Sequence, residues 1–218
     1  MPIVQKKYCE IRDCMKPGDV IAFSGKKALS ETIKWATRSN VSHVGVVLQS
    51  RLIVDGEPEG RVFNQVAEAT DSGVKIVNLS GKQQVYEGEM WWLPLSDASR
   101  GRLNFNTFSG FLIDSEGAPY DSLPTLFKSW RDDLDVLPCV LPDFLEITRN
   151  KEDFEAFFCS ELVAGALETG GVIENVNASE VTPIDLCRFN IYEKYVQFKG
   201  EEKEIRGFNS VDPTNWGQ

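Results

Sequence analysis

Two residues of this 218-residue chain have side chains that could form a nucleophile and base pair, His43 and Cys159. His43 is the only histidine and lies in the β-rich run Ser42-His43-Val44-Gly45-Val46-Val47. Alternation along a strand puts His43, Gly45 and Val47 on one face, and the glycine leaves room beside the imidazole for another chain segment or a substrate. A core histidine with a satisfied hydrogen bond is the simpler interpretation unless a partner nucleophile exists.

Cys159 is the candidate nucleophile, and it lies in Phe157-Phe158-Cys159-Ser160-Glu161-Leu162-Val163-Ala164. The pattern predicts a helix over Ser160–Thr169, ended by Gly170-Gly171. At the start of a helix, the positive end of the dipole and the unpaired N–H groups favour a thiolate and could receive an oxyanion. A small buried hydrophobe is the alternative interpretation. Because Glu161 partly opposes thiolate formation, a nearby imidazolium is needed.

The elements that must position these two residues come in a strand-rich half and then a helix-rich half. Turn signals and β-propensity predict strands over Val20–Phe23, Ser42–Leu48, Val62–Ala69, Gly73–Leu79, Glu89–Leu95 and Tyr192–Lys199. Periodicity and capping signals predict helices over Lys27–Arg38, Asp97–Ile113, Leu123–Trp130, Ser160–Thr169 and from Thr182-Pro183-Ile184-Asp185. A long irregular connection is expected over Arg131–Asp153. This order predicts an α+β fold, with residues 1–218 as a single domain whose core spans about 15–200.

The charge and apolar patterning exclude several partners. The chain has 33 acidic against 23 basic residues, a formal net charge of −10. Nucleic acids and anionic membrane surfaces both favour the opposite sign. No apolar run approaches the roughly 20 residues that span a bilayer, and the first ten residues lack a signal-peptide pattern. We therefore expect a cytoplasmic protein with no nucleic-acid partner and no integral membrane segment.

The five cysteines indicate reduced thiols. They are Cys9, Cys14, Cys139, Cys159 and Cys187. An odd, irregularly spaced set in a chain of this length is not typical of a disulfide framework. The C-x4-C spacing of Cys9 and Cys14 is not a usual zinc pattern, and no second pair or spare histidine completes a site. We expect no metal site and no cofactor.

An ordered series of segments resembles a known family. The segments are Met15–Phe23, Ser42–Leu48, Glu68-Ala69, Tyr120-Asp121, Phe158–Ala164 and Thr182–Leu186. The series is similar to the circularly permuted, YiiX-like branch of the NlpC-type papain-fold cysteine hydrolases, in which the histidine precedes the cysteine. The resemblance covers about Met15 to Leu186 and implies a permuted papain-like fold with an antiparallel sheet packed on helices.

The resemblance also implies roles for single residues. Cys159 would attack an acyl carbon, and His43 would hold the thiolate and later protonate the leaving group. Glu68 matches the group that orients the imidazole, with Asn64 and Asn78 as alternatives. Tyr120 matches a tyrosine whose hydroxyl could bind an oxyanion or a substrate, although a tyrosine packed on the helices is an equal alternative.

The implied function is hydrolysis of an amide in a small peptide, a cell-wall fragment or an N-acyl amino acid. One alternative is an acyltransferase or thioesterase acting on lipid-like acyl groups, which would favour a membrane-facing apolar patch. Trp91-Trp92 and Phe105–Phe111 could form such a patch, although core packing also explains them. Another alternative is a catalytically silent structural or binding module.

Overall fold

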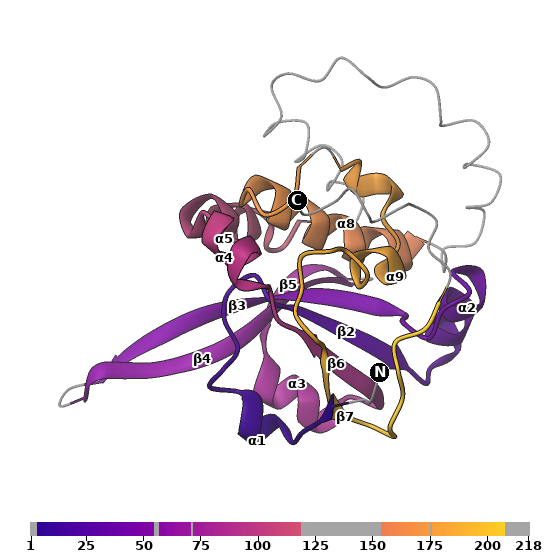
Figure 1. Cartoon of the computed structure of the whole chain (residues 1–218), viewed down its shortest axis with the longest axis horizontal. Helices are drawn as coiled ribbons and strands as arrows, with labels where there is room; N and C mark the ends of the chain where they lie inside the picture. The colour runs from indigo at the N-terminus through magenta and orange to yellow at the C-terminus, as the bar shows by residue number, and fades with distance from the viewer. Residues whose placement is uncertain (1–3, 55–56, 71, 119–153, 175, 208–218) are drawn as a thin grey trace, which may run out of the picture.

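The computed structural model describes residues 4–54, 57–70, 72–118, 154–174 and 176–207. Within these ranges the chain forms a seven-stranded sheet in the order β1-β7-β6-β2-β3-β4-β5, with helices on both faces (Figure 1). Neighbouring strands are antiparallel except β1 and β7, which pair in parallel. The α+β class expected from the sequence is confirmed at this level.

The bounds of the elements are as follows. The strands are β1 (Val4–Gln5), β2 (Val20–Gly25), β3 (His43–Val54), β4 (Glu57–Thr70), β5 (Gly73–Asn78), β6 (Gly88–Leu93) and β7 (Val196–Lys199). The helices of the described residues are α1 (Tyr8–Ile11), α2 (Ala28–Ala36), α3 (Leu79–Val85), α4 (Asp97–Arg102), α5 (Phe105–Ser115), α8 (Phe154–Thr169) and α9 (Pro183–Leu186), with a 3-10 turn η2 (Ala178–Glu180).

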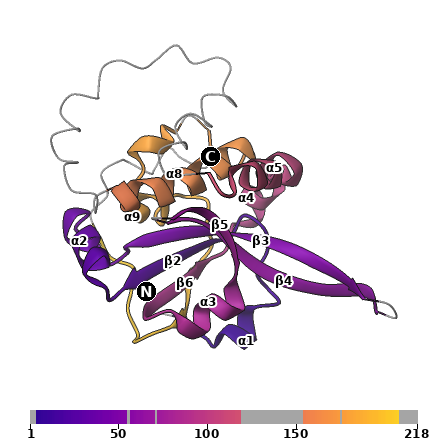
Figure 2. The ribbon, with the colours of Figure 1, turned by 180° about the vertical axis from the view of Figure 1, so that it is seen from behind.

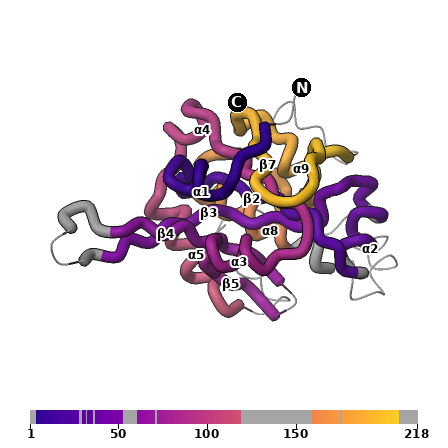
Figure 3. Tube along the Cα trace, turned by 90° about the horizontal axis from the view of Figure 1, so that it is seen from below, coloured from indigo at the N-terminus to yellow at the C-terminus, as the bar shows by residue number. Residues whose placement is uncertain are grey.

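The strands β3 and β4 are longer than their sequence patterns predicted. Their antiparallel register runs from Val46 opposite Ala67 to Val54 opposite Glu57. Figures 2 and 3 show the outer half of this pair projecting from the body as a two-stranded ribbon. The sequence pattern covered only Ser42–Leu48 and Val62–Ala69 and missed the outer residues of this ribbon.

The helices differ from expectation in two places. The predicted helix Asp97–Ile113 is two helices, because the Asn104 side chain caps a new helix by accepting from the backbone N–H groups of Asn106 and Thr107. Helix α3 was not predicted, and it begins after Asn78, whose side chain accepts from the N–H of Gly81 at 3.1 Å. The predicted helix Leu123–Trp130 and the connection Arg131–Asp153 lie outside the described residues.

A buried carboxylate fixes the start of β2. Asp19, which is fully buried, follows Gly18, whose φ of +88° suits glycine. Its carboxylate accepts from the indole N–H of Trp92 at 2.8 Å and from the N–H of Leu95 at 3.0 Å, and it forms an ion pair with Arg100. The fully partnered charge ties β2 to β6 and α4, so the turn signal before β2 is structural.

Alternation along the central strands creates a core on each face of the sheet. Val44 and Val46 of β3 belong to the core shared with α8, whereas Val47 belongs to the core with α1 and α3. Figure 1 shows α8, α5 and α9 above the sheet and α1 and α3 below it. His43, at the first position of β3, shares the parity of Val47 and so belongs to the α3 face.

Candidate active site

Cys159 lies inside a helix rather than at its beginning. Helix α8 starts at Phe154, so the predicted start at Ser160 was wrong. The effect of a helix dipole falls off within the first turn, and the free N–H groups of a helix start lie before Cys159. Stabilisation of a thiolate at Cys159, which is buried, must therefore come from neighbouring side chains.

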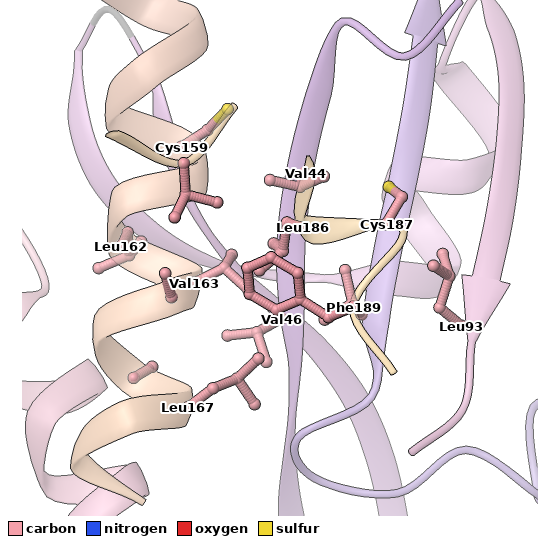
Figure 4. Close-up of a cluster of buried hydrophobic side chains, with 14 of the residues drawn as sticks. Val44, Val46, Leu93, Cys159, Leu162, Val163, Leu167, Leu186, Cys187 and Phe189 are labelled. Atoms are coloured by element: carbon pink, nitrogen blue, oxygen red, sulfur yellow. The ribbon is translucent and has the colours of Figure 1, made fainter. Parts of the chain in front are cut away.

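Hydrophobic packing sets the position of α8 against the sheet. Figure 4 shows Cys159, Leu162 and Val163 on the helix facing Val44 and Val46 of β3. All five side chains are fully buried in one cluster. Because this core is close-packed, the backbone of Cys159 is held at a fixed distance from the beginning of β3.

A second tether joins α8 to the chain that follows it. The Ser160 hydroxyl donates to the carbonyl of Val181, next to the start of α9. There the Thr182 hydroxyl accepts from the N–H of Asp185 at 3.3 Å, and the Asp185 carboxylate accepts from the N–H of Thr182 at 3.0 Å. The predicted Thr cap with proline in the first turn is confirmed.

His43 connects the sheet to Cys159. Its Nε2 lies 2.7 Å from the Oε2 of Glu68, and the Cys159 side chain is within hydrogen-bonding reach of the imidazole. Because Nε2 faces Glu68, Nδ1 is the ring nitrogen left for the sulfur. The ring also contacts Phe23, with centroids 5.4 Å apart. The structure thus brings together three residues from β3, β4 and α8.

The environment of His43 favours the imidazolium. Burial is the largest single effect on the His43 pKa and lowers it, but the contacts with Cys159 and Glu68 outweigh burial and raise the pKa to about 9. The side chain remains 21% exposed. At neutral pH the ring is therefore protonated and can serve as the counter-ion of a thiolate.

Glu68 is ionised despite its burial. Its side chain is only 4% exposed, and burial alone would raise the pKa of the carboxyl. The contacts with His43 and with Lys82 prevail and lower this pKa to about 2. A buried carboxylate is stable in this position because two cationic groups share it.

Gly45 allows Glu68 to approach the histidine. A Cβ at this position would lie 2.6 Å from Cγ2 of Val66, 2.9 Å from the carbonyl oxygen of Ala67 and 3.4 Å from Cβ of Glu68. The space that the sequence suggested beside the imidazole is therefore filled by strand β4.

The sequence pattern missed Lys82, which contacts the same carboxylate. Its Nζ lies 2.6 Å from Oε2 of Glu68 and also bonds Oε1. The ammonium is 4.9 Å from the ring centroid of Phe23. The Asn78 cap was the one sequence signal for α3, and nothing in the sequence linked this helix to Glu68.

Tyr86, the residue that follows α3, was also missed. Its ring lies 5.1 Å from that of Phe23, and its hydroxyl is hydrogen-bonded to Ser42. Burial raises the pKa of this phenol well above its ordinary value, although the Ser42 bond opposes the change. Tyr86 therefore presents a neutral hydroxyl within electrostatic range of Cys159.

The two alternative orienting residues have other partners. The Asn64 amide donates to the carbonyl of Arg12 at 2.6 Å and accepts from Gln49 at 2.8 Å, while Asn78 caps α3. In the described part of the chain neither bonds to His43. Asn64 lies four residues before Glu68 on β4, and Asn78 lies at the end of β5. Of the three candidates, Glu68 is the one that touches the imidazole.

The remaining candidates are dispersed. Tyr120 and Cys139 lie outside the described residues. Cys9 and Cys14 are free and exposed, whereas Cys187 is free and buried, and burial raises the pKa of its thiol strongly. Across the described ranges, no three His, Cys, Asp or Glu side chains are grouped to hold a metal ion. Among the same residues, no helix is sufficiently long and apolar to cross a membrane.

Comparisons with known proteins give little further identification. No family model matches the chain, and no curated protein matches it. Among solved structures, it is similar to the metalloprotein yiiX from Escherichia coli O157:H7, with 21% sequence identity and a TM-score of 0.40. The match covers 71% of this chain and 66% of the yiiX chain. At this level the similarity carries no information on the chemistry of Cys159 and His43, which depends on their own geometry.

Proposed function

We propose that this protein is a cysteine hydrolase that cleaves an amide bond in a small peptide, a cell-wall fragment or an N-acyl amino acid. One observation carries the proposal: the single histidine lies between the Cys159 thiol and the buried Glu68 carboxylate, 2.7 Å from the latter. A thiol beside an imidazole that a third polar group orients is the arrangement of an activated nucleophile.

In the first step, the Cys159 thiolate attacks the carbonyl carbon and forms an S–C bond, while the carbonyl π electrons move to oxygen. When the tetrahedral intermediate collapses, the C–N bond breaks and the His43 imidazolium gives its proton to the departing amine. The products of this step are the free amine and a thioester on Cys159. His43 is left neutral, with Glu68 still bonded to Nε2.

In the second step, water attacks the thioester carbon while neutral His43 takes one of its protons. Collapse of the second intermediate breaks the S–C bond, releases the carboxylic acid and restores the thiolate and imidazolium pair. His43 thus acts first as an acid and then as a base. The bond to Glu68 keeps one ring orientation through both steps.

The architecture supports a finer proposal about the fold. We propose that the sheet and α8 are the two halves of a circularly permuted papain-like domain of the NlpC type. The histidine strand β3 precedes the cysteine helix α8 along the chain, the reverse of the papain order. The cysteine helix packs on the face of the sheet opposite α3, and the imidazole meets the sulfur at the beginning of β3.

Thiol reactivity provides the first test. Iodoacetamide at mildly acidic pH should label Cys159 ahead of the other four cysteines, because an imidazolium beside the sulfur keeps it as the reactive thiolate. Mass spectrometry identifies the labelled residue. Cys9 and Cys14 are exposed and Cys159 is buried, so access alone predicts the opposite order. Labelling in order of exposure would overturn the assignment of the nucleophile.

Turnover provides the second test. A panel of short amino-acid and peptide amides, N-acyl amino acids and one lipid ester should show release from at least one amide without an added acceptor. Cys159→Ser should abolish that release, whereas Cys187→Ser, a matched change at a second buried thiol, should preserve it. Turnover of the lipid ester alone, or only with an acyl acceptor, would contradict an amide hydrolase and favour an acyltransferase.

A further inference from the structure

We propose that Lys82 is a positioning residue whose ammonium neutralises the Glu68 carboxylate and thereby weakens the electrostatic attraction between Glu68 and the His43 imidazolium. Its catalytic meaning rests on the proposed hydrolase function, but its electrostatic effect on the imidazole can be measured without turnover.

The contacts of Lys82 distinguish it from a solvated surface lysine. Its ammonium bonds both oxygens of Glu68, and the side chain is only 19% exposed. The same ammonium lies 4.9 Å from the ring centroid of Phe23 and 5.9 Å from that of Tyr86. A carboxylate on one side and two aromatic rings on the other hold this cation in place.

Lys82 and His43 share one acceptor atom. Oε2 of Glu68 lies 2.7 Å from Nε2 of His43 and 2.6 Å from Nζ of Lys82. A carboxylate that bonded the imidazolium alone would stabilise it strongly and make its proton hard to donate. The second cation removes much of that excess negative charge. The carboxylate then orients the ring in a manner closer to that of a neutral amide.

The groups that face His43 come from every element around it. Cys159 approaches the imidazole from α8 and Glu68 from β4, while the Phe23 ring of β2 packs against it. Lys82 bonds the Glu68 carboxylate, which in turn bonds the imidazole. The change in its charge is therefore expected to reach His43 chiefly through Glu68.

Lys75 supplies a matched control. It lies directly opposite Glu68 in the β4–β5 register, yet its side chain is exposed and, within the described residues, forms no ion pair with Glu68. Lys75→Met therefore removes the same charge from a nearby position without removing a contact. A solvent-exposed charge of this kind should have little effect on a buried ring.

The test is an NMR titration of the imidazole, which needs no assignment because His43 is the only histidine. Lys82→Met should raise the titration midpoint of His43 by about one to two pH units, since Nζ and Nε2 bond the same Oε2, at 2.6 Å and 2.7 Å, and the lost cation is therefore separated from the imidazole by a single oxygen atom. Lys82→Gln, which keeps hydrogen-bond donors without the charge, should give a similar rise. Lys82→Arg should stay close to the wild type, and so should Lys75→Met.

Each result has a separate meaning. If Lys82→Met and Lys82→Gln leave the midpoint unchanged, or if Lys75→Met shifts it equally, the role of Lys82 is wrong. A wild-type midpoint near 6.5 would instead contradict the thiolate and imidazolium pair of the proposed function, while the shift in the Lys82 variants would still be measured. With an active substrate, the pH at which turnover falls on the alkaline side should be higher in Lys82→Gln than in the wild type. In Lys82→Arg it should be close to the wild-type value.

Discussion

Replacing His43 by Gln should remove a pH-dependent part of the free energy of unfolding. The folded protein raises the pKa of His43 from 6.5 to about 9, so the folded state binds the proton more tightly than the unfolded chain. The resulting stabilisation is fully present below pH 6.5 and is lost as the pH rises through 9. At 1.36 kcal/mol per pH unit, the shift corresponds to about 3 kcal/mol.

Urea unfolding at several pH values between 6 and 9.5 measures this effect. The free energy of unfolding of the wild type minus that of His43→Gln should fall by about 3 kcal/mol across the range. Taking the difference cancels the groups whose proton affinity does not depend on His43. The steepest part should have a slope of about 1.4 kcal/mol per pH unit, because one proton is involved.

A difference that stays constant from pH 6 to 9.5 would refute this reasoning, since it would mean that replacing His43 leaves the net uptake of protons on unfolding unchanged. Glu68→Gln serves as a second comparison. It removes one of the two groups that raise the pKa of His43 and leaves the other, Cys159, in place. The fall with pH should therefore become smaller in that background without vanishing.

Four further substitutions test residues in and around the site. Glu68→Gln should lower turnover by roughly 10²–10⁴-fold. Asn64→Ala should instead lower the free energy of unfolding in urea by about 1–3 kcal/mol, because it breaks two hydrogen bonds remote from the imidazole. A larger loss of turnover in Asn64→Ala than in Glu68→Gln would reassign the orienting residue. Gly45→Ala should destabilise the fold by about 1–3 kcal/mol and reduce turnover, since its Cβ would lie 2.6 Å from Cγ2 of Val66; unchanged stability would show that β4 shifts freely. Burial raises the pKa of Glu161 from 4.5 to about 7, so its contribution to stability is present below pH 4.5 and is lost as the pH rises through 7. Over that interval the free energy of unfolding of the wild type should fall by about 3 kcal/mol relative to that of Glu161→Gln. Equal pH dependence of the two free energies would contradict this prediction.

Local patterns predicted the strands that carry the site. The alternation around His43 placed it on the face opposite Val44 and Val46, and the structure has that parity. Strand β4 has the same alternation, because Ala67 and Ala69 belong to the α8 core and Glu68 faces the other side. Period-two patterns are informative here since a slip of one residue would bury the wrong face.

The contacts that the patterns missed depend on tertiary packing. Lys82 meets Glu68 only because β5 and α3 fold back beside β4, and a seven-residue helix has too few turns for a clear period. The predicted start of α8 at Ser160 was six residues later than the observed start at Phe154. Short helices and helix ends are positioned by neighbours as much as by their own residues.

The buried charges of the site form a neutral set when the thiol is ionised. A thiolate on Cys159, an imidazolium on His43, a carboxylate on Glu68 and an ammonium on Lys82 alternate in sign through successive contacts. Burying one isolated charge is costly, whereas each ion in this series has a neighbour of opposite sign. Because α8 places Cys159 beyond the reach of its N-terminal dipole, the proposed thiolate would depend on this series. In the proposed hydrolase, Glu68 would orient the histidine while Lys82 balances the charge of the carboxylate.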